Sequence, residues 1–431
     1  MPLRLDSRNA DFADGFAAFL AMKREVSADV EAVARGIIAE VQARGDAALF
    51  EATRKFDRFD LNAGNLRVSD ADIDAAVAAC DPATLDALAL ARDRIEAFHR
   101  RQTPKDERFT DAQGVELGWR WSAIEAVGLY VPGGTAAYPS SVLMNAVPAK
   151  VAGVQRLVMV VPAPDGQLNP LVLAAAKLAG VNEIYRIGGA QAIAALAYGT
   201  ATIEPVAKIV GPGNAFVAAA KRLVFGKVGI DMIAGPSEVL VLADDTANPD
   251  WIAADLLAQA EHDANAQSIL ITDSDDIALQ TERAIASQLG TLPRAKIAQA
   301  SWDEFGAIIR VDDMAQAVPL ANRIAAEHLE IMTADADALA AQVHNAGAIF
   351  IGGYTPEAIG DYVGGSNHVL PTARSARFSS GLGVLDFMKR TSILKCGPDQ
   401  LRALGPAAMT LGMAEGLDAH ARSVGVRLNL R

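Results

Sequence analysis

The sequence predicts an α/β protein with two parallel β-sheets, each covered by helices on both faces. From about Glu125, short runs of β-branched residues alternate strictly with alanine-rich segments of helical length. Strands separated by helices form βαβ units, which place the strands parallel to one another and bury both faces of the sheet. The alternation continues to about Gly383, which is long enough for two such sheets.

Helices dominate the region before this alternation. Over residues 1–130, apolar side chains such as Val30, Val33, Ile37 and Val41 recur at helical spacing. The charged residues between them fall on another face of the same helix. We therefore expect this region to consist mainly of amphipathic helices with one face in water.

The expected elements of the sheets follow in chain order. We expect six strands, over Leu157–Val161, Glu183–Ile187, Lys208–Val210, Val239–Ala243, Ser268–Thr272 and Ala348–Ile351. We expect three helices between them, over Leu171–Ala179, Ala190–Tyr198 and Ala215–Val224. Gly180 and Gly199 end the first two of these helices. After Gly383 a final helix, about Gln400–Ala421, precedes a polar end.

Charge and cysteine content exclude several classes of function. The net charge of −13 argues against a nucleic-acid partner, because binding phosphates needs clustered cationic side chains. Cys80 and Cys396 are the only cysteines and form no CxxC motif, as expected in a reducing compartment. We see no signal peptide and no uncharged apolar stretch of about 18 residues, so we expect a cytoplasmic protein that does not span a membrane.

The loop Gly128–Ser141 is the first of several loops that suit a ligand. In α/β proteins ligands bind at strand ends, where backbone amides and helix N-termini converge. Gly133 and Gly134 would let this backbone approach a ligand closely, and the helix that follows would favour an anion such as a pyrophosphate. The sequence contains no GxGxxG motif, so a plain turn is an equal alternative for this loop.

Two further glycine loops, Gly188–Ala192 and Gly211–Ala215, each lie between a predicted strand and a predicted helix. Gln191 and Asn214 in these loops carry amides that could bond a ribose or a carboxamide. The alternative role is capping of the helix that follows, for which asparagine is well suited.

Gln259 and His262 lie three residues apart on a predicted helix, which places both side chains on one face. The helix begins at the pair Asn248-Pro249, a typical N-cap and first helical position. An imidazole with an amide one turn away could bind a metal such as zinc. The alternative is an exposed pair without a ligand, since glutamine is an uncommon metal ligand.

The loop Gly352–His368 is rich in glycine, which makes its ordering costly in chain entropy. It also contains Asp361 and His368, both of residue types that commonly form sites on loops. We therefore interpret this loop as functional and not as a simple connection.

Two acid–histidine pairs lie outside the glycine loops. Glu327 and His328 are adjacent where a helix ends and a strand begins, so each would act on a different proton. Glu415 and His420 lie five residues apart on the final helix, where packing is the alternative role. We interpret His99 as part of a basic, exposed helix end.

Together these segments resemble the histidinol dehydrogenase family over nearly the whole chain. The resemblance rests on eight segments in matching order, Gly128–Ser141, Gly188–Ala192, Gly211–Ala215, Ala234–Leu240, Gln259–His262, Ala326–Glu330, Gly360–Thr372 and Glu415–His420. Each motif is modest alone, but eight at compatible spacing are highly specific. No position that is expected to be functional departs from the family pattern.

The resemblance implies a zinc enzyme that oxidises L-histidinol to L-histidine through the aldehyde and reduces two NAD+. It implies one zinc per subunit, held by Gln259, His262, Asp361 and His420. The catalytic residues would be Glu327 and His328. The substrate pocket would combine the four zinc ligands with Ser237, His328, His368 and Glu415. NAD would contact Tyr130, Gln191 and Asn214.

The resemblance also implies how the chain is divided. It predicts two Rossmann-like α/β domains, the first formed by residues 26–130 with 237–382 and the second by residues 131–236. The first would carry the zinc and substrate residues and the second the NAD contacts. Helical arms are expected over residues 1–25 and 383–431. The C-terminal arm would be exchanged in an intertwined homodimer, so that His420 reaches the site of the partner subunit.

The residues suit these roles chemically. Oxidation of an alcohol needs a base for the hydroxyl proton, and His328 has a side chain that ordinarily titrates near neutrality. Oxidation of the aldehyde needs an added water, which Glu327 could activate. Cys80 and Cys396 lie outside every motif, which favours water over a cysteine adduct. Zinc would act mainly as a template for the nitrogen donors of the substrate.

Three other interpretations stay open. Paralogues in the family oxidise other small alcohols, including a sulfonated propanediol, although the pocket residues listed above favour histidinol. A zinc hydrolase could use Glu327 on a metal-bound water, but glycine loops at three successive strand ends indicate a dinucleotide cleft. A non-catalytic metabolite-binding protein would leave many reactive side chains without a role.

Overall fold

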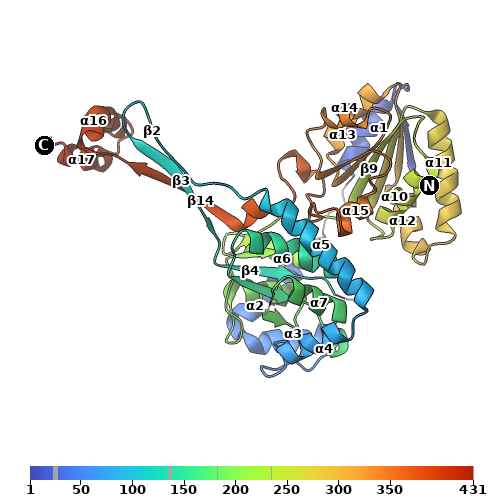
Figure 1. Ribbon diagram of the computed structural model, residues 1–431, viewed down its shortest axis with the longest axis horizontal. Coiled ribbons are helices and arrows are strands. Elements are labelled where there is room, and N and C mark those ends of the chain that lie inside the picture. Colours follow the sequence, from blue (N-terminus) through green and yellow to red (C-terminus); the bar gives the residue numbers. More distant parts are fainter. Residues whose placement is uncertain (23–27, 134–137, 182, 234, 431) are drawn as a thin grey trace.

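The computed structural model describes residues 1–22, 28–133, 138–181, 183–233 and 235–430. They form two α/β domains and an arm that projects away from both (Figure 1). One domain has a six-stranded sheet, the other a five-stranded sheet, and the arm a three-stranded sheet. Both domain sheets are parallel throughout, which confirms the predicted fold class. Within these residues, no helix has both the length and the apolar character to cross a membrane.

The six-stranded sheet belongs to the domain that contains the N-terminus. Its strands lie in the order β1 (Leu3–Asp6), β11 (Ala307–Arg310), β10 (Gln267–Thr272), β9 (Glu238–Ala243), β12 (His328–Met332) and β13 (Ala348–Ile351). Counted along the chain, the five strands from β11 to β13 have the order 3-2-1-4-5. This order matches five of the six strands of a dinucleotide-binding fold, whose order is 3-2-1-4-5-6.

Helices cover both faces of this sheet. One face buries apolar side chains against α1 (Phe12–Ala21), α13 (Met314–Ile324) and α14 (Ala336–Ala340). The other face packs against α10 (Pro249–Ala260), α11 (Asp275–Leu289) and α12 (Ala295–Phe305). Successive residues of a strand point to opposite faces, so the central strands place apolar side chains on both faces of the sheet. A short helix, α15 (Glu357–Tyr362), follows β13.

The five-stranded sheet repeats the same strand order. Its strands lie in the order β6 (Glu183–Tyr185), β5 (Arg156–Val160), β4 (Ala126–Tyr130), β7 (Lys208–Val210) and β8 (Gly229–Ile230). One face packs on α4 (Asp70–Ala78), α5 (Pro82–Arg100), α6 (Pro139–Val151) and α7 (Pro170–Leu178). The other packs on α2 (Ala28–Arg44), α3 (Asp46–Asp57), α8 (Gly189–Tyr198) and α9 (Ala215–Val224).

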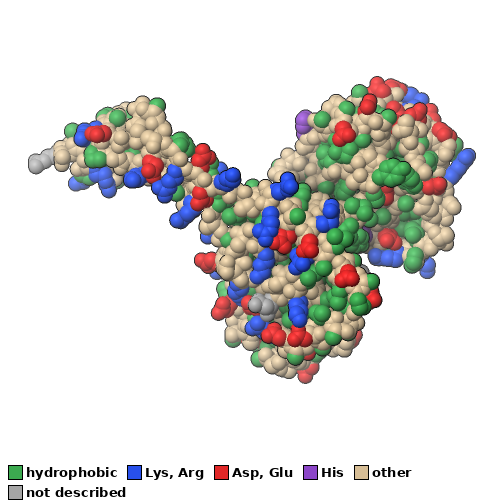
Figure 2. All heavy atoms as spheres, viewed as in Figure 1, with side chains coloured by type: hydrophobic (Ala, Val, Ile, Leu, Met, Phe, Trp, Pro, Cys, Tyr) green, Lys and Arg blue, Asp and Glu red, His purple; other side chains and the backbone are tan. Residues whose placement is uncertain are grey.

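The arm combines two distant parts of the chain. Its antiparallel sheet has the order β14 (Met388–Lys395), β3 (Glu116–Ala123) and β2 (Glu107–Thr110). Two helices, α16 (Pro398–Ala414) and α17 (Asp418–Arg427), form its tip next to the C-terminus (Figure 1). Figure 2 shows apolar and basic side chains together on its surface, and the apolar ones include Phe109, Leu394 and Leu411.

The structure corrects the predicted domain boundaries at the N-terminal side. Residues 1–25 were expected to form a helical arm, but β1 pairs in parallel with β11, and Phe16 and Phe19 enter the core beside the six-stranded sheet. Helices α2 to α5 pack on the five-stranded sheet, whereas the prediction placed residues 26–130 with residues 237–382. Periodicity shows that a helix has an apolar face, but not which sheet will cover that face.

The C-terminal region also differs from its prediction. Residues 383–431 are not a purely helical tail, because β14 pairs with β3 over its whole length and Phe387 is buried in the core of the five-stranded domain. The predicted helix over 400–421 is two helices, broken at Gly416, whose φ is +71°. The strands β2, β3 and β4 were absent from the predicted elements, which took residues 1–130 as mainly helical.

Candidate active site

The first cluster of predicted site residues lies at the amino edge of the six-stranded sheet. His328 is the first residue of β12, and Glu238 is the first residue of the neighbouring strand β9. Glu327 and Ser237 directly precede these strands. Helix α10 follows β9 and runs back beside the sheet, so Gln259 near its C-terminal end returns to the amino edge.

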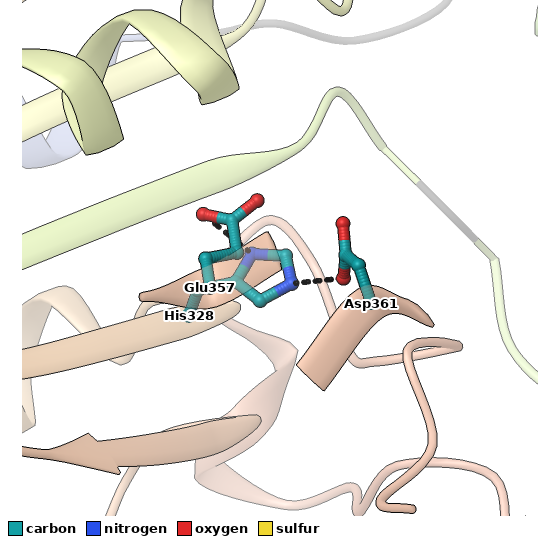
Figure 3. Close-up of side chains that lie close together, drawn as sticks. All are labelled: His328, Glu357 and Asp361. Carbon is teal, nitrogen blue, oxygen red and sulfur yellow. Dashed lines mark ion pairs between the residues drawn. The ribbon is translucent and has the colours of Figure 1, made fainter. Parts of the chain in front are cut away.

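His328 is buried at the centre of this cluster (Figure 3). Its Nδ1 lies 3.0 Å from the carbonyl oxygen of Glu238 and donates to it, because a carbonyl only accepts. Its Nε2 is therefore the acceptor nitrogen, and it has no hydrogen-bond partner among the described residues. Burial lowers the pKa of His328 to about 3, not near neutrality as its residue type alone suggested, so the imidazole is neutral.

Carboxyl groups surround this imidazole. Glu357 Oε2 lies 3.8 Å from Nδ1 of His328, and Asp361 Oδ1 lies 3.8 Å from Nε2 (Figure 3). Glu327 accepts a hydrogen bond of 3.1 Å from the backbone N–H of Glu238. Burial raises the pKa of Glu327 and Glu357 well above its usual range and raises the pKa of Asp361 to about 7. A cation among carboxyl groups crowded in this way would favour their charged forms.

The predicted pair Gln259 and His262 lies at the same edge. Gln259 Nε2 is 3.1 Å from His262 Nδ1, so the two side chains are neighbours. The predicted shared helix face is wrong in one respect, because α10 ends at Ala260 and His262 lies in the turn that follows it. Gln259 is fully buried, and its Oε1 has no hydrogen-bond partner among the described residues. His262 is exposed. One member of the pair therefore reaches solvent while the other holds an unused acceptor inside the protein.

His368 joins the two domains at this site. Its Nδ1 donates to the carbonyl of Asp361 at 3.0 Å, and its Nε2 lies 3.4 Å from Ser141 Oγ at the start of α6. The preceding residue, Asn367, donates to the carbonyl of Met144 on α6 at 2.7 Å. Because α6 follows β4, these contacts bring the carboxyl edge of the five-stranded sheet toward the amino edge of the six-stranded sheet.

His99 belongs to the same junction, which the sequence interpretation missed. It is fully buried and not at an exposed helix end. Its Nδ1 lies 2.8 Å from Gln102 Oε1, and its Nε2 lies 3.4 Å from Asn367 Nδ2. Burial lowers the pKa of His99, so its neutral form packs from the end of α5 against the loop that carries His368.

The second cluster of predicted residues lies at the carboxyl edge of the five-stranded sheet. Tyr130 is the last residue of β4, and its buried hydroxyl accepts a hydrogen bond of 3.0 Å from the N–H of Gly189. A Cβ at Gly188 would lie 2.5 Å from Pro162 Cβ, and one at Gly133 would lie 2.9 Å from the Pro162 carbonyl oxygen. These loops therefore approach Pro162 more closely than side chains at these two positions would allow. Gly134, the other predicted glycine, lies outside the described residues.

Gln191 and Asn214 are both at this carboxyl edge, at the starts of α8 and α9. The side chain of Gln191 is buried. Asn214 caps α9, since its Oδ1 accepts from the N–H groups of Phe216 and Val217 at 3.1 and 3.2 Å. The capping alternative for Asn214 is confirmed, and its exposed amide nitrogen is the group that could donate to a ligand.

Glu415 and His420 are not part of either cluster within one chain. Both are exposed and lie in the tip of the arm, away from the two domains (Figure 1). They also sit on different helical segments, because Glu415 ends α16 and His420 belongs to α17. Any role of these two residues at the site described above needs a second copy of the chain.

Glu357 is the site residue that the sequence interpretation missed. Its carboxyl, His328 and Asp361 offer ligand atoms that all lie within 4.8 Å of one another. Glu357 and Asp361 are four residues apart, a spacing that places two side chains on one face of a helix. That spacing was visible in the glycine loop 352–368, but nothing in the loop's composition predicted that a helix would begin there.

The fold and the two facing clusters define an α/β protein of the oxidoreductase class. One sheet has glycine loops at its carboxyl edge, and the other brings an imidazole and several carboxyl groups toward them. The chain belongs to the histidinol dehydrogenase family, whose model matches residues 20–428.

Individual relatives agree with this assignment over their whole length. The histidinol dehydrogenase of Rhodopseudomonas palustris is 79% identical over 431 residues, and that of Bradyrhizobium diazoefficiens is 78% identical over 430 residues. Both alignments cover 100% of each chain. The crystal structure of histidinol dehydrogenase from Elizabethkingia anophelis superposes with a TM-score of 0.94 at 36% identity, covering 99% of this chain and 98% of that one.

Proposed function

We propose that this protein oxidises L-histidinol to L-histidine through the aldehyde, using two NAD+. Membership of the histidinol dehydrogenase family supports the reaction. The observation that carries the proposal is the position of His328 and its neighbouring carboxyl groups near the junction with the five-stranded domain, where Nε2 has no hydrogen-bond partner in the described part of the chain. The proposal includes a cytoplasmic location and no nucleic-acid or membrane partner.

The carboxyl edge of the five-stranded sheet suits NAD+. In a sheet of order 3-2-1-4-5, the strand order reverses between the first and fourth strands, here β4 and β7, and ligands bind outside that point. Tyr130 ends β4, and Gly211 directly follows β7. The N-termini of α8 and α9 at the same edge would favour the pyrophosphate. Tyr130, Gln191 and Asn214 are the proposed contacts.

The cluster at the amino edge of the six-stranded sheet suits one zinc ion per subunit. The amide oxygen of Gln259 is buried without a hydrogen-bond partner among the described residues, and burial raises the pKa of the Asp361 carboxyl, as expected where a cation belongs. We propose Gln259, His262 and Asp361 as ligands from one subunit and His420 as the fourth, from a second copy. When bound, the zinc would orient the imidazole and amine of the substrate.

The side chains of this chain would then move the protons. His328 is neutral, and Nε2 would accept the hydroxyl proton while a hydride passes from the alcohol carbon to the first NAD+. Glu327 would take a proton from the water that adds to the aldehyde. A second hydride passes to the second NAD+ and leaves the carboxylate. Ser237, His368 and, from a second copy, Glu415 would complete the substrate pocket.

Counting NADH formed per histidinol consumed tests the reaction. Two NADH are expected, and no NAD+ reduction with histidinol would favour another small alcohol as the substrate. Removal of metal by a chelator should abolish activity, and added zinc should restore it, because the buried amide and carboxyl groups lose their cation. Full activity in a sample free of metal by elemental analysis would contradict the zinc proposal.

The shared site predicts an intertwined homodimer, which subunit mixing tests. His420→Asn and His262→Asn homodimers should each be inactive. Mixed dimers should recover part of the activity, because one of the two sites then contains neither substitution. No recovery after verified subunit exchange would indicate a site built within one chain.

A further inference from the structure

A buried ion pair lies behind the loop that follows β7. Lys221 of α9 contacts Asp231, which comes directly after β8. Their side chains are only 3% and 1% exposed. Neither residue is part of the site proposed above. Burying a lysine and an aspartate needs close pairing, and a pair of this kind is weak evidence for stability alone.

The pair holds the backbone of Gly211 on both sides. Lys221 Nζ donates to the carbonyl oxygen of Gly211 at 2.9 Å. Asp231 Oδ2 accepts from the N–H of Gly211 at 2.8 Å. Asp231 Oδ1 also accepts from the N–H of Met232 at 2.7 Å, which ties the carboxylate to its own backbone. One residue therefore has both of its backbone polar groups bonded to opposite members of one ion pair.

Gly211 occupies a position that needs such support. Its φ is +107°, and a Cβ there would lie 2.2 Å from the carbonyl oxygen of Tyr130. The end of β7 is thus pressed against the end of β4, where the strand order reverses. Asn214 caps α9 three residues later. The loop Gly211–Asn214 is held by the ion pair at its start and by the cap at its end.

We propose that Lys221 and Asp231 are positioning residues that hold the loop Gly211–Asn214 in the shape that receives the dinucleotide. The inference rests on the proposed use of NAD+ at this edge. Charge-assisted hydrogen bonds are short and directional, so they fix a backbone more firmly than neutral contacts do. Preorganising this loop lowers the ordering cost of binding the cofactor. The loop follows β7 of the five-stranded sheet, whereas the histidine cluster lies at the start of β12 in the other sheet, so substrate binding is not expected to depend on the pair.

The same sheet offers a matched control at its opposite edge. Arg156, at the start of β5, pairs with Glu183 at the start of β6, with contacts of 2.8 and 2.9 Å. Arg156 also donates to the backbone carbonyls of Glu204 and Pro205 at 3.0 Å each. This partly buried ion pair also donates to backbone carbonyls of the same domain, but it lies at the opposite end of the strands from Gly211.

The test compares Lys221→Met, Asp231→Asn, their double variant and Arg156→Met in the full-length zinc-loaded enzyme. Lys221→Met should raise the KM for NAD+ and the Kd for NADH at least about tenfold, equivalent to about 1.4 kcal/mol, with little change in the KM for histidinol. The double variant should lose no more affinity than either single variant, because the pair acts as one unit. Arg156→Met should lower the unfolding temperature without changing the KM for NAD+.

Amide hydrogen exchange over residues 208–215 gives a readout independent of catalysis. Exchange in this segment should speed up in Lys221→Met and Asp231→Asn and stay unchanged in Arg156→Met. If Lys221→Met does not fold, the isosteric Asp231→Asn variant carries the same two measurements. Unchanged NADH affinity in a folded Asp231→Asn variant, or an equal loss in Arg156→Met, overturns the positioning role. Failure of the unaltered enzyme to bind NADH overturns the proposed function itself and is seen before any variant is made.

Discussion

The two domain sheets have the same strand order but use opposite edges. Both contain five parallel strands in the order 3-2-1-4-5, and in both the order reverses between the first and fourth strands. In the five-stranded sheet the predicted nucleotide residues lie at the carboxyl edge, at the ends of β4, β6 and β7. In the six-stranded sheet the imidazole and carboxyl cluster lies at the amino edge, where β9 and β12 begin.

The side chains at the two carboxyl edges explain this difference. After β4, β6 and β7, Gly133, Gly188 and Gly211 keep the edge free of side chains at positions where the backbone lies against Pro162 or Tyr130. Beside β9 and β12, Asp244 closes the same point, because its Oδ2 accepts from the N–H of Ala334 at 2.8 Å. Burial and the neighbouring Asp244 raise the pKa of Asp273 at the end of β10. An acidic edge already bonded to its own loops is unsuited to a phosphate.

The comparison teaches that strand order alone does not locate a site. A switch point becomes a binding site only where the loops are small and uncharged enough to admit a ligand. The six-stranded domain instead uses the start of β12 and the C-terminal end of α10. The loop with His368 then ties this amino edge to α6, so that one sheet can present a cofactor to residues of the other.

The largest effect is expected for His328→Asn, which tests whether the base and the cofactor contacts belong to different domains. It should lower kcat by about 10²- to 10⁴-fold, because the base of the six-stranded domain is lost. The Kd for NADH should stay unchanged, since His328 does not lie at the carboxyl edge of β4 and β7. Steady-state kinetics and fluorescence titration with NADH check both expectations, with the exposed His344→Asn as the control. Loss of NADH binding in His328→Asn would contradict the assignment of the base and the cofactor contacts to separate domains.

A substitution at the carboxyl edge of the five-stranded sheet should instead impair NADH binding. In Gly211→Ala the new Cβ would lie 2.2 Å from the Tyr130 carbonyl, so the ends of β7 and β4 must separate and NADH binding should be lost. Gly226→Ala is the matched control, with φ of +97° and nothing within 4 Å among the described residues. The free energy of unfolding in urea should fall by at least about 2 kcal/mol more in Gly211→Ala than in the control.

The zinc content of Gly211→Ala should match that of the unaltered protein, because the proposed ligands belong to the other domain and the arm. Elemental analysis of the folded variant measures this. Zinc loss in Gly211→Ala but not in Gly226→Ala would mean that the two edges are not separable, and that the cofactor loops shape the metal site as well.

The smallest effect is expected at the junction between the two domains, where His99 should make the free energy of unfolding depend on pH. Burial lowers the pKa of this imidazole below its ordinary 6.5, so the native protein binds the proton less readily than the unfolded chain does. The stability that neutral His99 contributes is therefore present above about pH 6.5 and is lost as the pH falls below it. Urea unfolding at about pH 8 and about pH 5 should show a larger decrease for the unaltered protein than for His99→Gln. Equal decreases in both proteins would mean that His99 does not titrate in this junction, and the exposed His344→Gln variant serves as the control.

Much of the local structure was predictable from the sequence. Strands such as Ser268–Thr272 and Lys208–Val210 are short apolar runs between helices, and the structure places strands there. The spacing of Gln259 and His262 predicted neighbouring side chains, and they are in contact, although His262 lies in the turn after α10 and not on the helix. The loops that contain Gly188 and Gly211 were predicted to lie between a strand and a helix, and the structure places them there. In each case the evidence lies within a few neighbouring residues.

Only the tertiary structure decided which distant segments meet. It placed α2 to α5 on the five-stranded sheet, paired β3 with β14, set Glu357 beside His328, and left His420 in an exposed arm. It also decided that the histidines of the six-stranded domain gather at an amino edge while the glycine loops gather at a carboxyl edge. The physical reason is that periodicity and turn residues depend on which side of each segment faces water and on its local backbone conformation. The partner that buries an apolar face or an imidazole depends instead on packing between segments that can be hundreds of residues apart.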